Sequence, residues 1–90
     1  MEEVVQEVQG KEIGEVTHFF SRIGVAVIKL TKDKLNVGDT IRIKGHTTDF
    51  EQKVDSMQID HKNINEAKKG AEIGMRVQEA VRENDTVYRL

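Results

Sequence analysis

The 90-residue sequence contains no cysteine, which excludes disulfide scaffolds, thiolate zinc sites and thiol nucleophiles. It also contains no proline, so its turns must rely on glycine, asparagine and aspartate. No apolar run approaches the roughly 18–20 residues of a membrane span. The acidic N-terminus, Met1–Val4, lacks the basic and apolar regions of a signal peptide. These absences predict a cytoplasmic protein without a membrane partner.

Aromatic side chains are also scarce, at 4% of the residues. We expect the three phenylalanines to lie in the core, which leaves no stacking platform for single-stranded nucleic acid. The net charge of −2, from 14 basic and 16 acidic residues, argues against a protein that coats nucleic acid unspecifically. The length predicts one domain over residues 1–90 with a modest core.

Apolar residues instead alternate with polar ones in short runs, the period of half-buried strands. Glycine or charged turns separate the runs every 8–15 residues, which is typical of an all-β fold. We favour a small closed antiparallel β-barrel of about six strands over a sandwich, because closure removes sheet edges. The predicted strands are 11–20, 25–30, 40–44, 50–59, 72–78 and 86–90. Within 50–59, either a bulge near Asp55–Ser56 or an inward Ser56 accounts for the change in alternation.

Finer expectations concern the remaining segments. In strand 11–20, alternation places Val16, His18 and Phe20 on one face. The spacing of Ile64 and Ala67 predicts a helical turn within 60–69. Residues 1–10 fit either an N-terminal arm or an edge strand.

Four motifs follow one another along the chain: Gly24–Val27, Leu35–Ile41, Val54–Gln58 and Ala67–Met75. In this order they resemble the second β-barrel domain of translational GTPases such as elongation factor Tu. The motifs also make physical sense without the family, since Gly38–Asp39 favours a tight turn between two strands, and Gly70 and Gly74 indicate another turn and a close backbone approach. The resemblance covers about four-fifths of the chain, and the same barrel also occurs as a non-catalytic appendage in some bacterial collagenase-like peptidases.

The chain departs from that family in lacking a Gly-x-x-x-x-Gly-Lys-Ser/Thr phosphate loop and room for a GTPase domain. The resemblance therefore implies a stand-alone, elongation-factor-like binding module that is not an enzyme. Its implied partners are ribosomal RNA, tRNA or a translation factor. The alternative is a protein–protein adaptor or accessory subunit of another enzyme, without RNA binding.

Basic residues are the candidate contacts for such partners, because phosphate groups are held by lysine and arginine on exposed rims. Interleaved acids leave ordinary solvated charge as the competing interpretation. The candidates are Lys32, Lys34, Arg42, Lys44, Lys62, Lys68 and Lys69.

No pattern indicates catalysis, a metal or a cofactor. Ser21 and Ser56 lack the Gly-x-Ser-x-Gly elbow of serine hydrolases. His18, His46 and His61 are far apart, and nothing in the sequence makes three or four ligands converge. We therefore predict no catalytic residue, no metal site and no cofactor.

Overall fold

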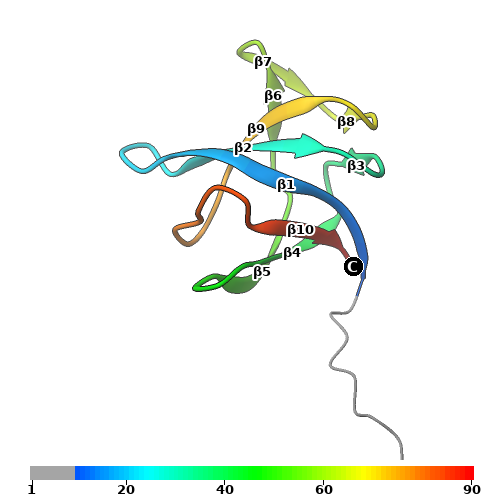
Figure 1. Cartoon of the computed structure of the whole chain (residues 1–90). Helices are drawn as coiled ribbons and strands as arrows, with labels where there is room; N and C mark the ends of the chain where they lie inside the picture. Colours follow the sequence, from blue (N-terminus) through cyan, green and yellow to red (C-terminus); the bar gives the residue numbers. More distant parts are fainter. Residues whose placement is uncertain (1–9) are drawn as a thin grey trace, which may run out of the picture.

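The computed structural model describes residues 10–90. This part of the chain is all-β and contains no helix (Figure 1). The strands are β1 (Lys11–Phe20), β2 (Val25–Leu30), β3 (Leu35–Asn36), β4 (Thr40–Lys44), β5 (Asp49–Lys53), β6 (Met57–Ile59), β7 (Lys62–Ile64), β8 (Glu66–Ala67), β9 (Glu72–Arg76) and β10 (Thr86–Arg89). The predicted all-β class is confirmed, while the predicted number of about six strands is wrong.

Eight strands form one antiparallel sheet in the order β5-β4-β10-β1-β2-β9-β6-β7, and β3 pairs separately with β8. The sheet curls strongly, so that β7 lies at the top of Figure 1 and β5 at the bottom. No ladder of backbone hydrogen bonds joins these two edge strands within the described residues. The antiparallel arrangement is therefore observed, whereas ladder closure into a barrel is not.

A buried side chain connects the edge strand β5 to the chain at the end of β9. The Gln52 amide on β5 donates to the Arg76 carbonyl at 3.0 Å and accepts from the Gln78 backbone N–H at 2.8 Å. Directly after β5, the Gly38 N–H donates to the Val54 carbonyl at 2.9 Å, which extends the pairing of β4 with β5. Gln52 is only 7% exposed, so both ends of its amide are satisfied inside the protein.

Alternation along the strands builds a single core. In β4, Ile41 and Ile43 point inward, and Arg42 lies between them on the outer side. The same period of two appears in β2, β5 and β9, as expected for a sheet with one wet face. Side chains with no exposed surface are Ile13, Val16, Ala26, Ile28, Leu30, Leu35, Ile41, Ile43, Val54, Met57, Ile73 and Val87.

The expected common face of Val16, His18 and Phe20 is wrong. The pairing of β1 with β2 shifts register between Val16 and His18, which marks an irregularity at Thr17. An extra residue in one strand reverses the side-chain alternation beyond it. Val16 is consequently buried, whereas His18 and Phe20 lie on the outer face.

The helical turn expected within 60–69 is also wrong. β6 and β7 form a hairpin whose two loop residues, Asp60 and His61, have φ of 52° and 66°. Positive φ at both loop positions is the geometry of a type I′ turn. Ala67 is buried as expected, but on the short strand β8.

The turn predictions hold at three glycines. Gly24, Gly38 and Gly70 all have positive φ, at 66°, 99° and 96°. The predicted arm or edge strand within 1–10 lies almost entirely outside the described residues, which begin at residue 10. In residues 10–90 the search for a helix long and apolar enough to cross a membrane found none.

Candidate functional site

A groove runs along the outer face of the sheet beside the β1–β2 turn, which projects at the left of Figure 1. Its main hollow has a volume of about 510 Å³. We call it the apolar groove and define it by five residues from three strands and a turn. These are Phe20, Ile23, Val25, Val27 and Gly74.

Strand register explains why these residues meet. Along β2, Ala26 and Ile28 point into the core, so Val25 and Val27 must face outward. Val27 lies opposite Gly74 on β9, and Gly74 lies opposite Gln58 on β6. Because Gly74 has no side chain, the row leaves a trough between Val27 and Gln58.

The fold itself does not require glycine at position 74. A Cβ atom built there would meet Val25 Cγ1 at 3.7 Å and the Gln58 carbonyl oxygen at 4.0 Å, which are ordinary contacts. At Gly14, by contrast, a Cβ atom would collide with the Lys29 carbonyl oxygen, and at Gly45 with the Asp85 carboxylate. The close backbone approach expected at Gly74 is therefore wrong, and its glycine keeps the groove open.

Two large apolar side chains at the β1–β2 turn border the groove. Phe20 is 47% exposed and Ile23 is 60% exposed. The prediction that all three phenylalanines lie in the core is thus wrong for Phe20, because the irregularity at Thr17 turns it outward. A packed edge-on contact with His18, with ring centroids 4.4 Å apart, holds the Phe20 ring over the sheet.

Polar side chains form one rim of the groove. Asp60 and His61 reach it from the β6–β7 turn, and Glu72 reaches it from β9. The Thr17 hydroxyl donates to Glu72 Oε2 at 3.3 Å. Non-glycine residues with positive φ are uncommon and concentrate at functional sites. Asp60 and His61 both have positive φ, which favours a functional role for this rim.

A second hollow of about 270 Å³ continues the groove toward Ser56 and Arg76. It shares Ile23, Val25, Gln58 and Gly74 with the main hollow. The acidic side chains thus stand at one end of the combined groove and Arg76 stands at the other.

The groove was not predicted from the sequence. Its signal was present in the run 25–30, which is apolar at nearly every position. That pattern predicts a strand covered on both faces, whereas in the structure the outward Val25 and Val27 remain half-exposed.

Two of the predicted basic contact residues form ion pairs with acidic residues of this chain. Lys32 pairs with Glu12 at 3.2 Å, and Arg42 donates twice to Asp49, at 2.7 and 2.8 Å. These bonds hold the pKa of the Arg42 guanidinium above its ordinary value and lower the pKa of Asp49. Two of the seven candidates are therefore already paired within the domain.

The seven basic residues also do not form one patch. The backbone N–H of Gly70 donates to the Leu30 carbonyl, which brings the Lys68–Lys69 turn beside the loop that carries Lys32 and Lys34. Lys44 lies at the opposite end of β4, and Lys62 lies on the separate β6–β7 hairpin.

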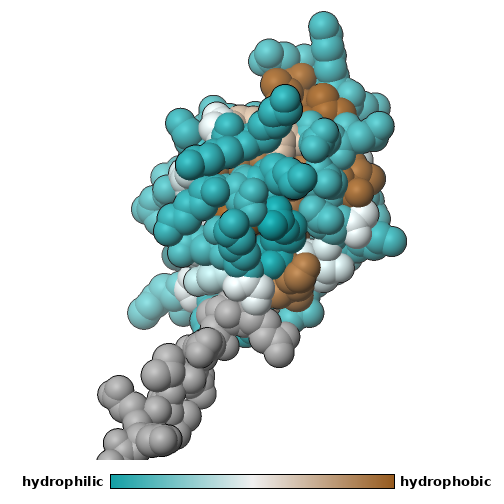
Figure 2. All heavy atoms as spheres, turned by 90° about the vertical axis from the view of Figure 1, so that its right-hand side faces the viewer, coloured by the Kyte–Doolittle hydropathy of each residue, from teal (hydrophilic) through white to brown (hydrophobic). Residues whose placement is uncertain are grey.

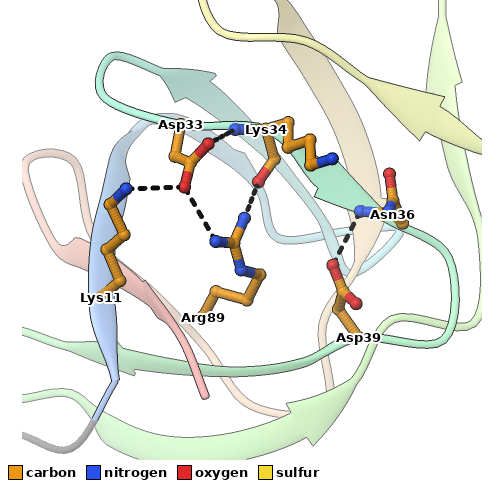
Figure 3. A network of polar contacts seen from close by, with 6 residues as sticks. All are labelled: Lys11, Asp33, Lys34, Asn36, Asp39 and Arg89. Carbon is orange, nitrogen blue, oxygen red and sulfur yellow. Dashed lines mark hydrogen bonds and ion pairs between the residues drawn. The ribbon is translucent and has the colours of Figure 1, made fainter.

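The loop after β2 belongs to a different polar cluster, which Figure 3 shows. Asp33 Oδ2 accepts from Arg89 at 2.8 Å and pairs with Lys11 at 2.9 Å, while Asp33 Oδ1 accepts the Lys34 backbone N–H at 2.8 Å. Arg89 also donates to the Lys34 carbonyl at 2.6 Å. We call Lys11, Asp33, Lys34 and Arg89 the terminal cluster, because it ties the start of β1 to the end of β10.

These contacts stabilise the ionised form of Asp33. Hydrogen bonds from Lys11, the Lys34 backbone and Arg89 hold the pKa of the Asp33 carboxyl well below its ordinary range. The side of the molecule that carries the β2–β3 and β8–β9 turns is mainly hydrophilic, with hydrophobic residues in separate spots (Figure 2). The terminal cluster therefore holds chain segments together and does not form a binding cavity.

No three His, Cys, Asp or Glu side chains converge as metal ligands within the part of the chain that the structure describes. The side chains of His18 and Glu83 approach to 3.5 Å, without a third such group. The distinctive surface feature is therefore the apolar groove with its acidic rim.

Comparison with known proteins points to peptidases. The chain is 49% identical over 80 residues to an uncharacterized protease of Methanocaldococcus jannaschii, a match that covers 88% of this chain and 19% of that protein. It is 37% identical over 78 residues to a collagenase of Porphyromonas gingivalis, covering 86% of this chain and 22% of that protein. The chain thus spans about a fifth of the length of these relatives, and no family model matches it.

Solved structures agree on the fold. The C-terminal domain of a Geobacillus thermoleovorans protein described as a "putative U32 peptidase" superposes with a TM-score of 0.83 at 12% identity, over 96% of this chain and 99% of that chain. A selenomethionine variant of the same domain gives a TM-score of 0.81 at 15% identity, over 87% and 98% of the two chains.

These findings correct the family assignment. The relatives are named as protease and collagenase rather than as translation factors, so the elongation-factor assignment and the predicted RNA-contacting function are wrong. The prediction that the chain is not an enzyme is contradicted by the names of these relatives, of which it spans about a fifth. The alternative of an accessory part of another enzyme fits better, and the partners and cytoplasmic location stay predictions.

Proposed function

We propose that this chain is an accessory domain of a U32-type peptidase and that it binds the polypeptide on which the peptidase acts. The observation that carries the proposal is the match of nearly the whole chain to one segment of a protease and of a collagenase. The fold supports it, because a C-terminal domain of a protein described as a U32 peptidase has the same architecture.

A groove on the outer face of a sheet suits this role. The core needs none of the exposed apolar surface of Phe20 and Ile23, and exposed apolar surface rimmed by polar residues is typical of interaction sites. Binding to the polypeptide away from the scissile bond raises its local concentration at the catalytic centre.

We further propose that the curled sheet behaves in solution as a closed barrel of the kind predicted from the sequence. Support comes from Gln52, whose amide joins β5 to the chain beyond β9. A hydrogen bond from the Val37 N–H to the Asn65 carbonyl joins the β3–β4 turn to the chain that follows β7. A rigid closed scaffold would hold the groove in one shape.

The experiment uses the Porphyromonas gingivalis collagenase. One variant lacks the segment that matches this chain, and a second carries the corresponding segment of this chain in its place. We expect deletion to slow collagen cleavage by about tenfold or more, since a tethered second binding site raises the effective substrate concentration. The chimera should restore most of the lost activity.

Cleavage of a short peptide is the control, because a peptide that fills only the catalytic centre gains nothing from a second site. Unchanged peptide cleavage in the deletion variant shows that its catalytic part is folded. If that variant cleaves collagen as fast as the parent enzyme, the proposed function is wrong.

A further inference from the structure

The fold does not require the apolar groove to stay open. Ile23 is 60% exposed, and the space above Gly74 would admit a Cβ atom at ordinary contact distances. Exposed apolar side chains cost free energy in water unless another surface covers them. The groove therefore has the properties of a surface that is covered only when a ligand is present.

The size of the groove favours a short segment of chain as that ligand. The main hollow, of about 510 Å³, lies in the range of sites that bind small molecules, and the second, of about 270 Å³, is slightly smaller than that range. A stable dimer of two copies needs roughly 800 Å² of buried surface on each partner. A pair of hollows bordered by Phe20 and Ile23 is too local a feature for such an interface.

The charges on the rim indicate what the segment carries. Asp60 and Glu72 both line the main hollow, and neither forms an ion pair within residues 10–90. The neighbouring Lys29 lies between Glu15 and Glu72 on the ladders of β2, outside the groove lining, so this row keeps a net negative charge. A cationic side chain would complement this end of the groove.

The β6–β7 turn fixes the position of one acid at a conformational cost. Asp60 and His61 both adopt positive φ, which asparagine and glycine adopt more readily than most residues. The two-residue turn is held by the pairing of Ile59 with Lys62, so the Asp60 carboxylate is presented to the groove by a short, well-defined loop.

We propose that the apolar groove binds an extended polypeptide segment in which an aliphatic side chain is followed by lysine or arginine. The aliphatic side chain packs on Val25, Val27 and Ile23 above Gly74, and the cation lies between Asp60 and Glu72. The inference deepens the proposed function, on which it rests for the identity of the ligand as the peptidase's polypeptide substrate.

The test titrates blocked peptides into the 90-residue protein and follows the backbone amide signals by NMR. Three peptides are compared, with central sequences Gly-Leu-Lys-Gly, Gly-Leu-Glu-Gly and Gly-Gly-Lys-Gly. The first should bind most tightly and shift the amide signals of Val25, Val27, Gln58 and Gly74. The other two should each bind at least about threefold more weakly, because one loses the ion pair and the other the apolar contact.

Matched variants separate the two contributions. Ile23→Ser should weaken binding of the leucine–lysine peptide by about tenfold, as expected for losing a buried aliphatic contact. Leu90→Ser, which also replaces an exposed aliphatic residue, should leave binding unchanged. Replacing both rim acids by Asp60→Asn and Glu72→Gln should abolish the preference for lysine over glutamate, whereas Asp55→Asn with Glu66→Gln should not.

Asparagine tolerates the positive φ of position 60, so the first pair of substitutions removes charge without forcing the turn to change. Failure of all three peptides to bind would overturn the inference, as would a lysine preference that survives removal of both acids. The peptide assay contains no peptidase, so its outcome is independent of the collagenase deletion. Peptide binding together with fully active deleted collagenase would instead contradict the proposed function alone.

Discussion

The apolar groove and the terminal cluster lie on the same curled sheet and differ in how their side chains are satisfied. In the terminal cluster, Asp33 is held by Lys11, Arg89 and the Lys34 backbone. In the groove, the acids Asp60 and Glu72 form no ion pair within the described residues, and large apolar side chains remain exposed.

The difference separates structural from functional surface in a domain of modest size. A cluster whose donors and acceptors are paired joins chain segments that are far apart in sequence, and it offers little to a ligand. A surface with exposed apolar groups and unpaired charge contributes little to folding, so these groups are available to bind a partner. Substitutions in the two regions should therefore change different properties.

The largest contrast is expected between Leu30→Ala and Ile23→Ala. Leu30 is fully buried where β2 leads into the terminal cluster, so truncation should lower the free energy of unfolding by about 2–5 kcal/mol. Ile23 is 60% exposed, and its truncation should change stability by no more than about 0.5 kcal/mol. Urea unfolding of both variants measures this, and equal destabilisation would remove the distinction between the regions.

Two glycines give the next contrast. Gly14→Ala places a Cβ atom against the Lys29 carbonyl oxygen, so separation of β1 from β2 should cost about 1–3 kcal/mol. Gly74→Ala meets only ordinary contacts and should cost less than about 0.5 kcal/mol while partly filling the groove. Thermal unfolding distinguishes them, and a strongly destabilised Gly74→Ala variant would show that glycine serves the fold there.

A smaller effect of opposite sign is expected at the groove rim. His61→Gly relieves a positive φ of 66° and should raise the free energy of unfolding by about 1 kcal/mol. The matched change Asn63→Gly, in β7, should instead lower stability, because glycine weakens strand interiors. Chemical denaturation of both proteins tests whether the rim turn holds strain.

The smallest effect concerns the terminal cluster and pH. The pKa of Asp33 is lower in the folded protein than its ordinary value of 3.8, so its stabilising contribution is complete above that pH and declines as the pH falls below it. Wild-type protein should therefore lose more stability between pH 5 and pH 2.5 than Asp33→Asn does. Urea midpoints at both pH values measure the difference.

Arg89→Gln provides the control for this interpretation, because it removes one of the donors that lower the Asp33 pKa. It should reduce the same pH dependence, and combining it with Asp33→Asn should have little further effect. Identical pH dependence in all four proteins would contradict the assigned role of the terminal cluster.

Local alternation made much of the fold predictable. Strands 25–30 and 40–44 were predicted with their observed bounds, because β-branched residues and period-two patterns dominate there. The turn at Gly38 was also predictable, since glycine before aspartate favours positive φ. By contrast, the split of 60–69 into β7 and β8 depends on pairing with distant strands, which overrode a weak helical spacing.

The candidate site was largely unpredictable because it depends on register. The irregularity at Thr17 leaves no clear mark in the sequence, yet it turns Phe20 outward. The trough requires that Val27 lie opposite Gly74 and that Gly74 lie opposite Gln58, a row assembled from three separate strands. Basic residues were conspicuous in the sequence, but the fold distributes them over several regions of its surface.

The most direct test of the central claim is collagen cleavage by the Porphyromonas gingivalis collagenase chimera that carries the matching segment of this chain. Ile23→Ser in the groove is compared with Leu90→Ser beside the terminal cluster, since both remove an exposed aliphatic side chain. The groove variant should cleave collagen about tenfold more slowly, in line with the loss of one buried aliphatic contact, and the other should match the unsubstituted chimera. Equal collagen cleavage by both variants and the unsubstituted chimera would contradict the proposal that the apolar groove binds the polypeptide substrate.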